Sequence, residues 1–295
     1  MKFGGPPSKR SLDELLNSGI LLVKKPRGPT SHQLTAWVRE ILGIKKIGHG
    51  GTLDPMATGL MILAINRATK FSSYFLESDK SYDASIQLGS STDTDDAMGN
   101  IISSSDIILN EKDINKSLAS FIGQSMQTAP FFSALKHKGK PLYKYAREGE
   151  FISKPPREIN IFSIKNIICE HNKCSFIVHC SKGTYIRSIA RDLGDKLNSG
   201  GHLSALRRLS QGTFNIKNAM TIENIELNKL ITIEEAFSEL SEIQLDSNQT
   251  KFFMNGVKIE EINLEDDTYK IYDSSKKFLG LGMVSNSVLA LKRLV

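Results

Sequence analysis

The segment HGGTLDPMATG, residues 49–59, holds one charged side chain, Asp54, among Gly, Thr and Pro. A second unusual position is Arg187 in GTYIRSIARDLG, where we expect the first turn of a helix. The helix dipole disfavours a cation there by about 0.3–1 kcal/mol, so an anion should compensate the arginine. An arginine keeps a carboxylate ionised through a charge-assisted, often bidentate pair. Asp54 and Arg187 are candidates for such a pair, with Asp54 as a nucleophile or base.

Other catalytic chemistries find little support. None of the six histidines lies four residues from another, as the helical spacing of metal ligands requires. The sequence lacks GxxxxGK[ST], a GxGxxG that opens a helix, and the GxSxG of a nucleophilic serine. We therefore expect no metal and no nucleotide or dinucleotide cofactor.

Three cysteines, Cys169, Cys174 and Cys180, lie close together. An odd number in a short region favours reduced thiols over a disulfide framework. Their spacing matches no familiar zinc pattern, and CSFIVHC is typical of a strand.

Regular elements should hold Asp54 from both sides. Residues 20–23, ILLV, predict a strand. Thr30 and Gln33 form a capping box for a helix that Gly43 ends, with its core face at Leu34, Trp37, Val38, Ile41 and Leu42. The apolar run GLMILAI, residues 59–65, predicts a strand buried on both faces.

Later segments have equally readable patterns. Residues 82–88 alternate, which predicts a half-buried strand, and residues 111–122 have helical spacing. Thr184 is a candidate N-cap for the helix that carries Arg187. We expect residues 219–243 to be mostly helical and the last fifty residues to form short strands around Gly and Ser turns.

Positive charge gathers in two segments. Residues 1–70 carry 11 Lys and Arg against 4 Asp and Glu, and residues 132–217 carry 16 against 6. If the fold brings these segments together, they could grip a polyanion, and nucleic acid is the obvious candidate. A solvated surface remains the alternative explanation, because charge alone does not decide.

Six blocks over residues 19–214 resemble, in order, the signature blocks of the TruB family of tRNA pseudouridine synthases. They are GILLVKKPRGPTSH, GHGGTLDPMATGLMIL, KSYDASIQLG, QTAPFFSALKHKGKPLYKYAREGE, HCSKGTYIRSIARDLG and GHLSALRRLSQGTF. The resemblance implies an isomerase that converts uridine 55, in the TΨC loop of tRNA, to pseudouridine without metal or organic cofactor.

The resemblance also implies roles for individual residues. Asp54 matches the catalytic aspartate, expected to act on the ribose side of the glycosidic bond, and Arg187 matches its partner. Tyr82 matches the tyrosine that stacks on the target base and is proposed to move a proton at the sugar. The remaining matches are His49 near the flipped bases, Tyr185 and Leu206 in the site wall, Lys25 and Lys70 as RNA or structural contacts, and Arg207 and Arg208 as a solvated or phosphate-facing pair.

The implied chemistry explains why one carboxylate suffices. Cleavage of the C1′–N1 bond builds positive character on the sugar, which an anion stabilises. The base must stay in place and rejoin through C5, so water should be excluded. Direct attack by Asp54 on the sugar and passage through a glycal intermediate both stay open. The target nucleotide lies in the T-arm, at the elbow of the folded tRNA, and it must also be flipped out.

We expect an α+β fold with three parts: an N-terminal extension (1–18), for which disorder is an open alternative, a mixed-sheet catalytic domain (19–243), and a small β-rich, PUA-like C-terminal module (244–295). The sequence has neither a secretory signal nor a long apolar run, which favours a cytoplasmic protein with no membrane association. We expect a monomer that requires no protein partner. Two alternatives are a tRNA-folding chaperone that depends little on catalysis and a guide-RNA-dependent synthase.

Overall fold

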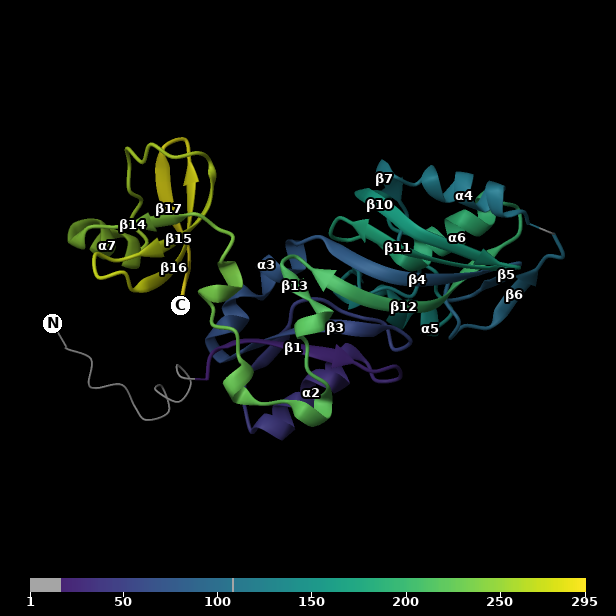
Figure 1. The fold of residues 1–295 in the computed structure, drawn as a ribbon, viewed down its shortest axis with the longest axis horizontal. Coiled ribbons are helices and arrows are strands. Elements are labelled where there is room, and N and C mark those ends of the chain that lie inside the picture. Colours follow the sequence, from purple (N-terminus) through teal and green to yellow (C-terminus); the bar gives the residue numbers. More distant parts are fainter. Residues whose placement is uncertain (1–16, 108) are drawn as a thin grey trace.

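A mixed β-sheet forms the body of the molecule in the computed structural model, which describes residues 17–107 and 109–295 (Figure 1). Its strand order is β1-β3-β12-β4-β11-β10-β7, with β2 paired to β3 and β13 to β12. The pairs are antiparallel except β3 with β12. The strands are β1 (Gly19–Lys25), β2 (Ile47–His49), β3 (Thr58–Ile65), β4 (Lys80–Leu88), β7 (Gly123–Gln127), β10 (Arg157–Glu170), β11 (Lys173–Cys180), β12 (Gly201–Gln211) and β13 (Phe214–Asn215).

The elements on either side of Asp54 form as their sequence predicts. Helix α2 (Ser31–Leu42) begins with the Thr30–Gln33 capping box and ends at Gly43, whose φ of 63° suits glycine. Strand β3 is buried along almost its whole length. The expected core position of Trp37 is wrong, because its side chain is 42% exposed. The helix buries a narrower stripe, centred on Leu34 and Val38, than its apolar pattern predicts.

Helices α4 (Glu111–Ala119) and α6 (Ile186–Lys196) lie on one side of the sheet, and α6 packs against β12 and β4 (Figure 1). Thr184 is not the N-cap of α6. Tyr185 holds that place without a side-chain cap, and Thr184 donates instead to the Ser181 carbonyl. The other elements of this part are η1 (Asn66–Phe71), α3 (Ser72–Glu77), β5 (Ser90–Thr92), β6 (Ile101–Ser104), β8 (Lys136–His137), β9 (Lys140–Pro141) and α5 (Leu142–Arg147).

The expectation that residues 219–243 are mostly helical is wrong. The segment pairs its backbone with β1 at Met220 and Ile231, and these bonds interrupt any long helix. Apolar side chains such as Ile222 and Ile225 pack on the core from short turns. The turns in and just before this segment are η2 (Ile216–Asn218), η3 (Ile222–Asn224), η4 (Leu227–Lys229) and η5 (Glu235–Phe237).

The C-terminal residues form a small lobe with its own sheet and apolar cluster (Figure 1). The strand order is β14-β15-β16-β17, which confirms the expected β-rich ending. Helix α7 was not expected, although Asp246 and Gln249 form a capping box at its start. The elements are β14 (Glu242–Gln244), α7 (Ser247–Met254), β15 (Asp267–Tyr272), β16 (Phe278–Ser285) and β17 (Val288–Leu294).

The cysteines are free, as expected, and the Sγ atoms of Cys169 and Cys174 lie 3.0 Å apart. Most of the expected N-terminal extension, residues 1–16, lies outside the described residues. Within the part of the chain that the structure describes, no helix combines the length and apolarity that a membrane crossing needs.

Candidate active site

Asp54 lies in the loop between β2 and β3, and hydrogen bonds from two side chains to the loop backbone hold it in shape. The Ser31 hydroxyl bonds both the amide and the carbonyl of Leu53, at 2.8 and 2.9 Å. The Lys25 ammonium donates to the carbonyls of Ala57 and Pro55, at 2.7 and 3.2 Å. The Asp54 side chain remains 31% exposed, so it is fixed in place but open to a ligand.

Gly59, the last residue of the segment HGGTLDPMATG, occupies a position that only glycine can fill. Its φ is +106°, and a Cβ atom there would lie 2.3 Å from the Arg208 carbonyl oxygen on β12. Only glycine permits this backbone angle together with so close an approach. The Asp54 loop is therefore held against β12 at its end.

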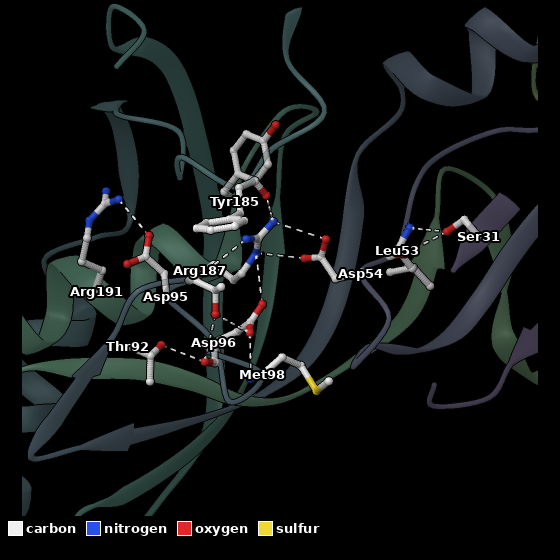
Figure 2. A network of polar contacts seen from close by, with 12 residues as sticks. Ser31, Leu53, Asp54, Thr92, Asp95, Asp96, Met98, Tyr185, Arg187 and Arg191 are labelled. Atoms are coloured by element: carbon white, nitrogen blue, oxygen red, sulfur yellow. Dashed lines mark hydrogen bonds and ion pairs between the residues drawn. The ribbon is translucent and has the colours of Figure 1, made fainter. Parts of the chain in front are cut away.

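Arg187 reaches Asp54 from the first turn of α6 (Figure 2). Its Nη2 atom donates to Asp54 Oδ1 at 3.2 Å, and its Nε atom lies 2.9 Å from Oδ2, at ion-pair distance but outside hydrogen-bond geometry. The arginine also donates to the carbonyls of Thr94 and Phe132, at 3.2 and 3.0 Å. The guanidinium is thus fixed on several sides, and its side chain is only 5% exposed.

A second carboxylate, Asp96, lies near the same Nε atom of Arg187 that Asp54 contacts (Figure 2). Its Oδ2 atom is 3.8 Å from Arg187 Nε, and its Oδ1 atom accepts hydrogen bonds from the Thr94 hydroxyl and the Met98 amide, both at 2.9 Å. Sequence reasoning missed Asp96, because STDTDDAMGN has the composition of a polar loop. The available signal was the cluster of aspartates just after the strand that carries Tyr82.

A cavity of about 520 Å³ opens beside Asp54. This volume lies in the range of small-molecule sites. The cavity gathers acidic, basic and aromatic side chains from segments far apart in the sequence. Among its lining residues are Asp54, Glu77, Lys80, Tyr82, Arg157, Glu158, Lys182, Tyr185, Arg187, Leu206 and Arg208.

Tyr82 enters this cavity from β4 and is almost fully buried. Burial raises the pKa of the Tyr82 phenol to about 12, although the nearby Arg208 guanidinium acts in the opposite direction. The phenol is therefore neutral at physiological pH. It can stack on a ligand or donate a hydrogen bond, but it is a poor base.

Arg208 is not the solvated or phosphate-facing residue that we expected, since it is only 1% exposed. It is paired across the strands with Tyr82, and its side chain donates to the Leu60 and Gly51 carbonyls at 2.7 and 3.3 Å. Lys25, 2% exposed, likewise makes structural contacts. Burial lowers the pKa of Lys25 to about 8.

The remaining candidates divide between cavity wall and surroundings. Tyr185 and Leu206 line the cavity, and the Arg157 guanidinium lies 5.0 Å from the Tyr185 ring centre. Arg207 is exposed and lines a separate cavity of about 170 Å³. His49 is half-buried and Lys70 is exposed, and neither contributes to the wall of the larger cavity.

Metal ligands are not grouped in this region. Within residues 17–107 and 109–295, no three or more His, Cys, Asp or Glu side chains are placed to hold an ion. The polar groups of the cavity can instead present the Asp54 carboxylate, two tyrosine rings and several cationic side chains to a bound molecule.

Family models match almost the whole chain. The model "TruB family pseudouridylate synthase (N terminal domain)" matches residues 39–186, and "tRNA pseudouridylate synthase B C-terminal domain" matches residues 187–247. "Pseudouridine synthase II TruB, C-terminal" matches residues 241–295, and a DKCLD (NUC011) domain model matches residues 1–35.

Curated relatives and solved structures agree with these matches. A Clostridium kluyveri protein named tRNA pseudouridine synthase B is 40% identical, over 90% of this chain and 95% of its own. A Methylobacillus flagellatus protein of the same name is 36% identical, over 97% and 96%. The Cbf5 structure in a Cbf5-Nop10-Gar1 complex, at 23% identity, has a TM-score of 0.71 over 99% of this chain and 89% of the other, which confirms the fold class. The chain belongs to the TruB family of pseudouridylate synthases.

Proposed function

We propose that this protein is a tRNA pseudouridine synthase that isomerises uridine 55 in the TΨC loop. The observation that carries the proposal is the Asp54 carboxylate, paired with a buried Arg187 at the wall of a cavity that also presents Tyr82. A carboxylate held by an arginine beside aromatic rings suits a reaction at a glycosidic bond. The relatives of this chain named tRNA pseudouridine synthase B support the same substrate class.

The reaction breaks the C1′–N1 bond of uridine and joins C1′ to C5. Positive character develops on the sugar as the first bond loosens, and Asp54 stabilises it by charge or by forming a bond to the sugar. The detached uracil turns within the cavity before C5 bonds to C1′. N1 gains a proton and C5 loses one, so the product is an isomer of the substrate.

Arg187 would hold the Asp54 carboxylate in place and aimed at the sugar. Its hydrogen bonds to two backbone carbonyls prevent it from swinging away when the carboxylate engages the substrate. Such preorganisation avoids reorganisation during the reaction, the usual source of electrostatic catalysis.

Tyr82 and Tyr185 would hold the extruded base, because both line the cavity that contains Asp54. Flipping a nucleotide costs a few kcal/mol, which stacking and phosphate contacts recover. The cavity wall carries the cations Lys80, Arg157 and Lys182 besides Arg187 and Arg208. These side chains supply positive charge beside the position proposed for the target nucleotide.

Replacement of Asp54 by Asn tests the assignment. The substitution retains the shape of the side chain but removes its charge. We expect the purified variant to release no tritium from tRNA labelled at uridine C5, while its Kd for tRNA stays within about twofold of the wild type. Unchanged turnover would remove Asp54 from the mechanism. If the wild-type protein forms pseudouridine at a position other than 55, the assigned target is wrong.

The same assay separates the two alternatives. With the Asp54→Asn substitution, a folding chaperone would still act on tRNA structure. An enzyme that uses Asp54 would no longer form pseudouridine. A guide-dependent synthase would leave naked tRNA unconverted. We expect the purified chain to convert naked tRNA as a monomer, with no protein partner and with EDTA present.

The finer assignments are part of this proposal. We assign residues 19–243 to catalysis, residues 244–295 to a small PUA-like module and residues 1–18 to an extension. We also place His49, Lys70 and Arg207 in contact with RNA around the cavity. Since the proposed substrate is tRNA, we place the protein in the cytoplasm.

A further inference from the structure

A second arginine on α6, Arg191, lies one helical turn after Arg187 (Figure 2). Residues four apart on a helix share a face. The Nη1 atom of Arg191 donates to Asp95 Oδ2 at 3.1 Å, and its Nη2 atom donates to the Thr128 carbonyl at 3.1 Å. Neither Arg191 nor Asp95 lines the cavity beside Asp54.

These two contacts reach the same two loops that hold Arg187. The first loop supplies the Thr94 carbonyl and the Asp96 carboxylate to Arg187, and Asp95 lies between them in the chain. The second loop supplies the Phe132 carbonyl to Arg187 and, four residues earlier, the Thr128 carbonyl to Arg191. Arg191 therefore ties together the segments that contact the Arg187 guanidinium.

The backbone conformation at Asp95 fixes the direction from which its side chain meets Arg191. Asp95 has a φ of +61°, a left-handed conformation that neighbouring contacts must maintain in a residue other than glycine. Its carbonyl accepts a hydrogen bond from the Leu203 amide at 3.0 Å, and the Ala97 amide donates to the Leu203 carbonyl at 2.9 Å. The side chain that points to Arg191 and the carbonyl that points to β12 together fix this turn.

Arg191 is the main counter-charge of Asp95, at 3.1 Å. Burial raises the pKa of the Asp95 carboxyl, and Arg191 is the strongest influence that opposes the increase. Without Arg191, a largely buried carboxylate would lose its main counter-charge, and the loop would have to move to rehydrate it.

We propose that the Arg191–Asp95 pair positions Arg187, and through it the Asp54 carboxylate, for the reaction. The inference rests on the proposed synthase function and adds two positioning residues to it. Because neither residue touches the cavity, their loss should slow the chemical step and leave RNA binding intact. A misplacement of about 1 Å in a catalytic group can cost about 100-fold in rate.

The experiment compares Arg191→Met, Asp95→Gly and the double variant with the wild type. Glycine at position 95 removes the carboxylate while tolerating the positive φ, so backbone strain does not obscure the result. Single-turnover tritium release gives the rate of the chemical step, and filter binding gives the Kd for tRNA. Asp192→Asn is the matched control, because Asp192 also pairs with Arg191, at 2.8 Å, but belongs to neither loop.

We expect each single variant to lose about 10- to 100-fold in the rate of the chemical step. The Kd should change less than about twofold, and the double variant should be no slower than the slower single variant, as expected of one coupled pair. Arg191→Lys should recover part of the rate, and Asp192→Asn should match the wild type. Thermal unfolding of each variant tests whether it is folded.

Two results would overturn the inference: a folded Arg191→Met variant with wild-type rate, or single effects that multiply in the double variant. A higher Kd for tRNA with an unchanged rate of the chemical step would also contradict the inference, since the pair would then act in binding. Failure of the wild-type protein itself to modify tRNA would instead reject the proposed function, so the two hypotheses fail separately.

Discussion

Arg187 faces two carboxylates with one atom: its Nε lies 3.8 Å from Oδ2 of Asp96, which does not line the cavity. Asp54 contacts the same guanidinium at 2.9 Å on the cavity side. Asp96 is 5% exposed and has hydrogen bonds of its own, so its carboxylate is held in position. Arg187 therefore pairs at once with a buried carboxylate and with the Asp54 carboxylate at the cavity wall.

Asp96→Asn should lower the rate of pseudouridine formation about 10- to 100-fold. The amide keeps an acceptor oxygen for the Thr94 hydroxyl and the Met98 amide, but the loss of charge leaves Arg187 with Asp54 as its close anionic partner. Single-turnover tritium release measures the rate. Asp106→Asn, at an exposed position outside the cavity wall, should have no effect. Equal rates in both variants would show that Asp96 does not support Arg187.

Local patterns in the sequence predict the elements around Asp54 well. The capping box at Thr30 and the apolar run of β3 depend on neighbours in the chain, and both form as expected. The unusual place of Arg187 in a first helical turn pointed to an anionic partner, and the partner is present. The capping box, the strand and the need of Arg187 for an anion are predictable because the physical cause of each lies within a few residues of it.

Long-range contacts explain what the sequence did not predict. Asp96 and Arg187 are 91 positions apart, and only the packing of α6 against the sheet brings them together. Arg208 follows another arginine in the sequence, and such a pair suggests an exposed position. Its side chain is instead buried, where it donates to carbonyls of β3 and of the Asp54 loop. Residues 219–243 have helical spacing, but backbone pairing with β1 competes more strongly.

Tyr82→Phe should reduce the rate of the chemical step about 100-fold if the phenol takes part in proton movement. Because the pKa of Tyr82 is raised to about 12, above the ordinary 10.0, the wild-type phenol stays protonated at pH 10. The wild-type to variant rate ratio should therefore be the same at pH 7 and pH 10. A ratio that falls by about half at pH 10 would indicate an unshifted tyrosine. Tyr74→Phe, outside the cavity wall, is the control.

The lowered pKa of Lys25 predicts that the stability of the protein depends on pH. Its pKa falls from 10.5 to about 8 on folding, so the unfolded chain binds more protons than the folded one between these values. The contribution of this group to stability is thus present above pH 10.5 and is lost as the pH falls through about 8. We expect the free energy of unfolding of the wild type, relative to Lys25→Met, to rise from pH 8 to pH 10.

Urea unfolding at several pH values measures this difference. Lys24→Met provides the comparison, because Lys24 is the preceding residue on β1 and is less buried. The difference between the wild type and Lys24→Met should be nearly constant with pH. A constant difference for Lys25→Met as well would show that the Lys25 ammonium pays no burial cost in the folded protein.

Arg157 should account for one phosphate contact in the complex with tRNA. It lines the cavity, its guanidinium stacks near Tyr185, and among the described residues no carboxylate pairs with it. An unpaired cation beside the site proposed for a flipped nucleotide is free to bind a phosphate. Neutralisation of one phosphate contributes about one unit to the slope of log Kd against log salt concentration. Arg157→Met should therefore weaken binding and reduce that slope by about one.

The salt series needs a control that removes the same charge elsewhere. Lys112 is exposed on α4 and does not line the cavity, so Lys112→Met should leave both Kd and slope unchanged. Equal slopes for the wild type and Arg157→Met would show that this arginine serves the fold through its contact with Tyr185. A reduced slope with an unchanged rate of the chemical step would place Arg157 in substrate binding, because a residue that only holds phosphate does not alter the barrier once tRNA is bound.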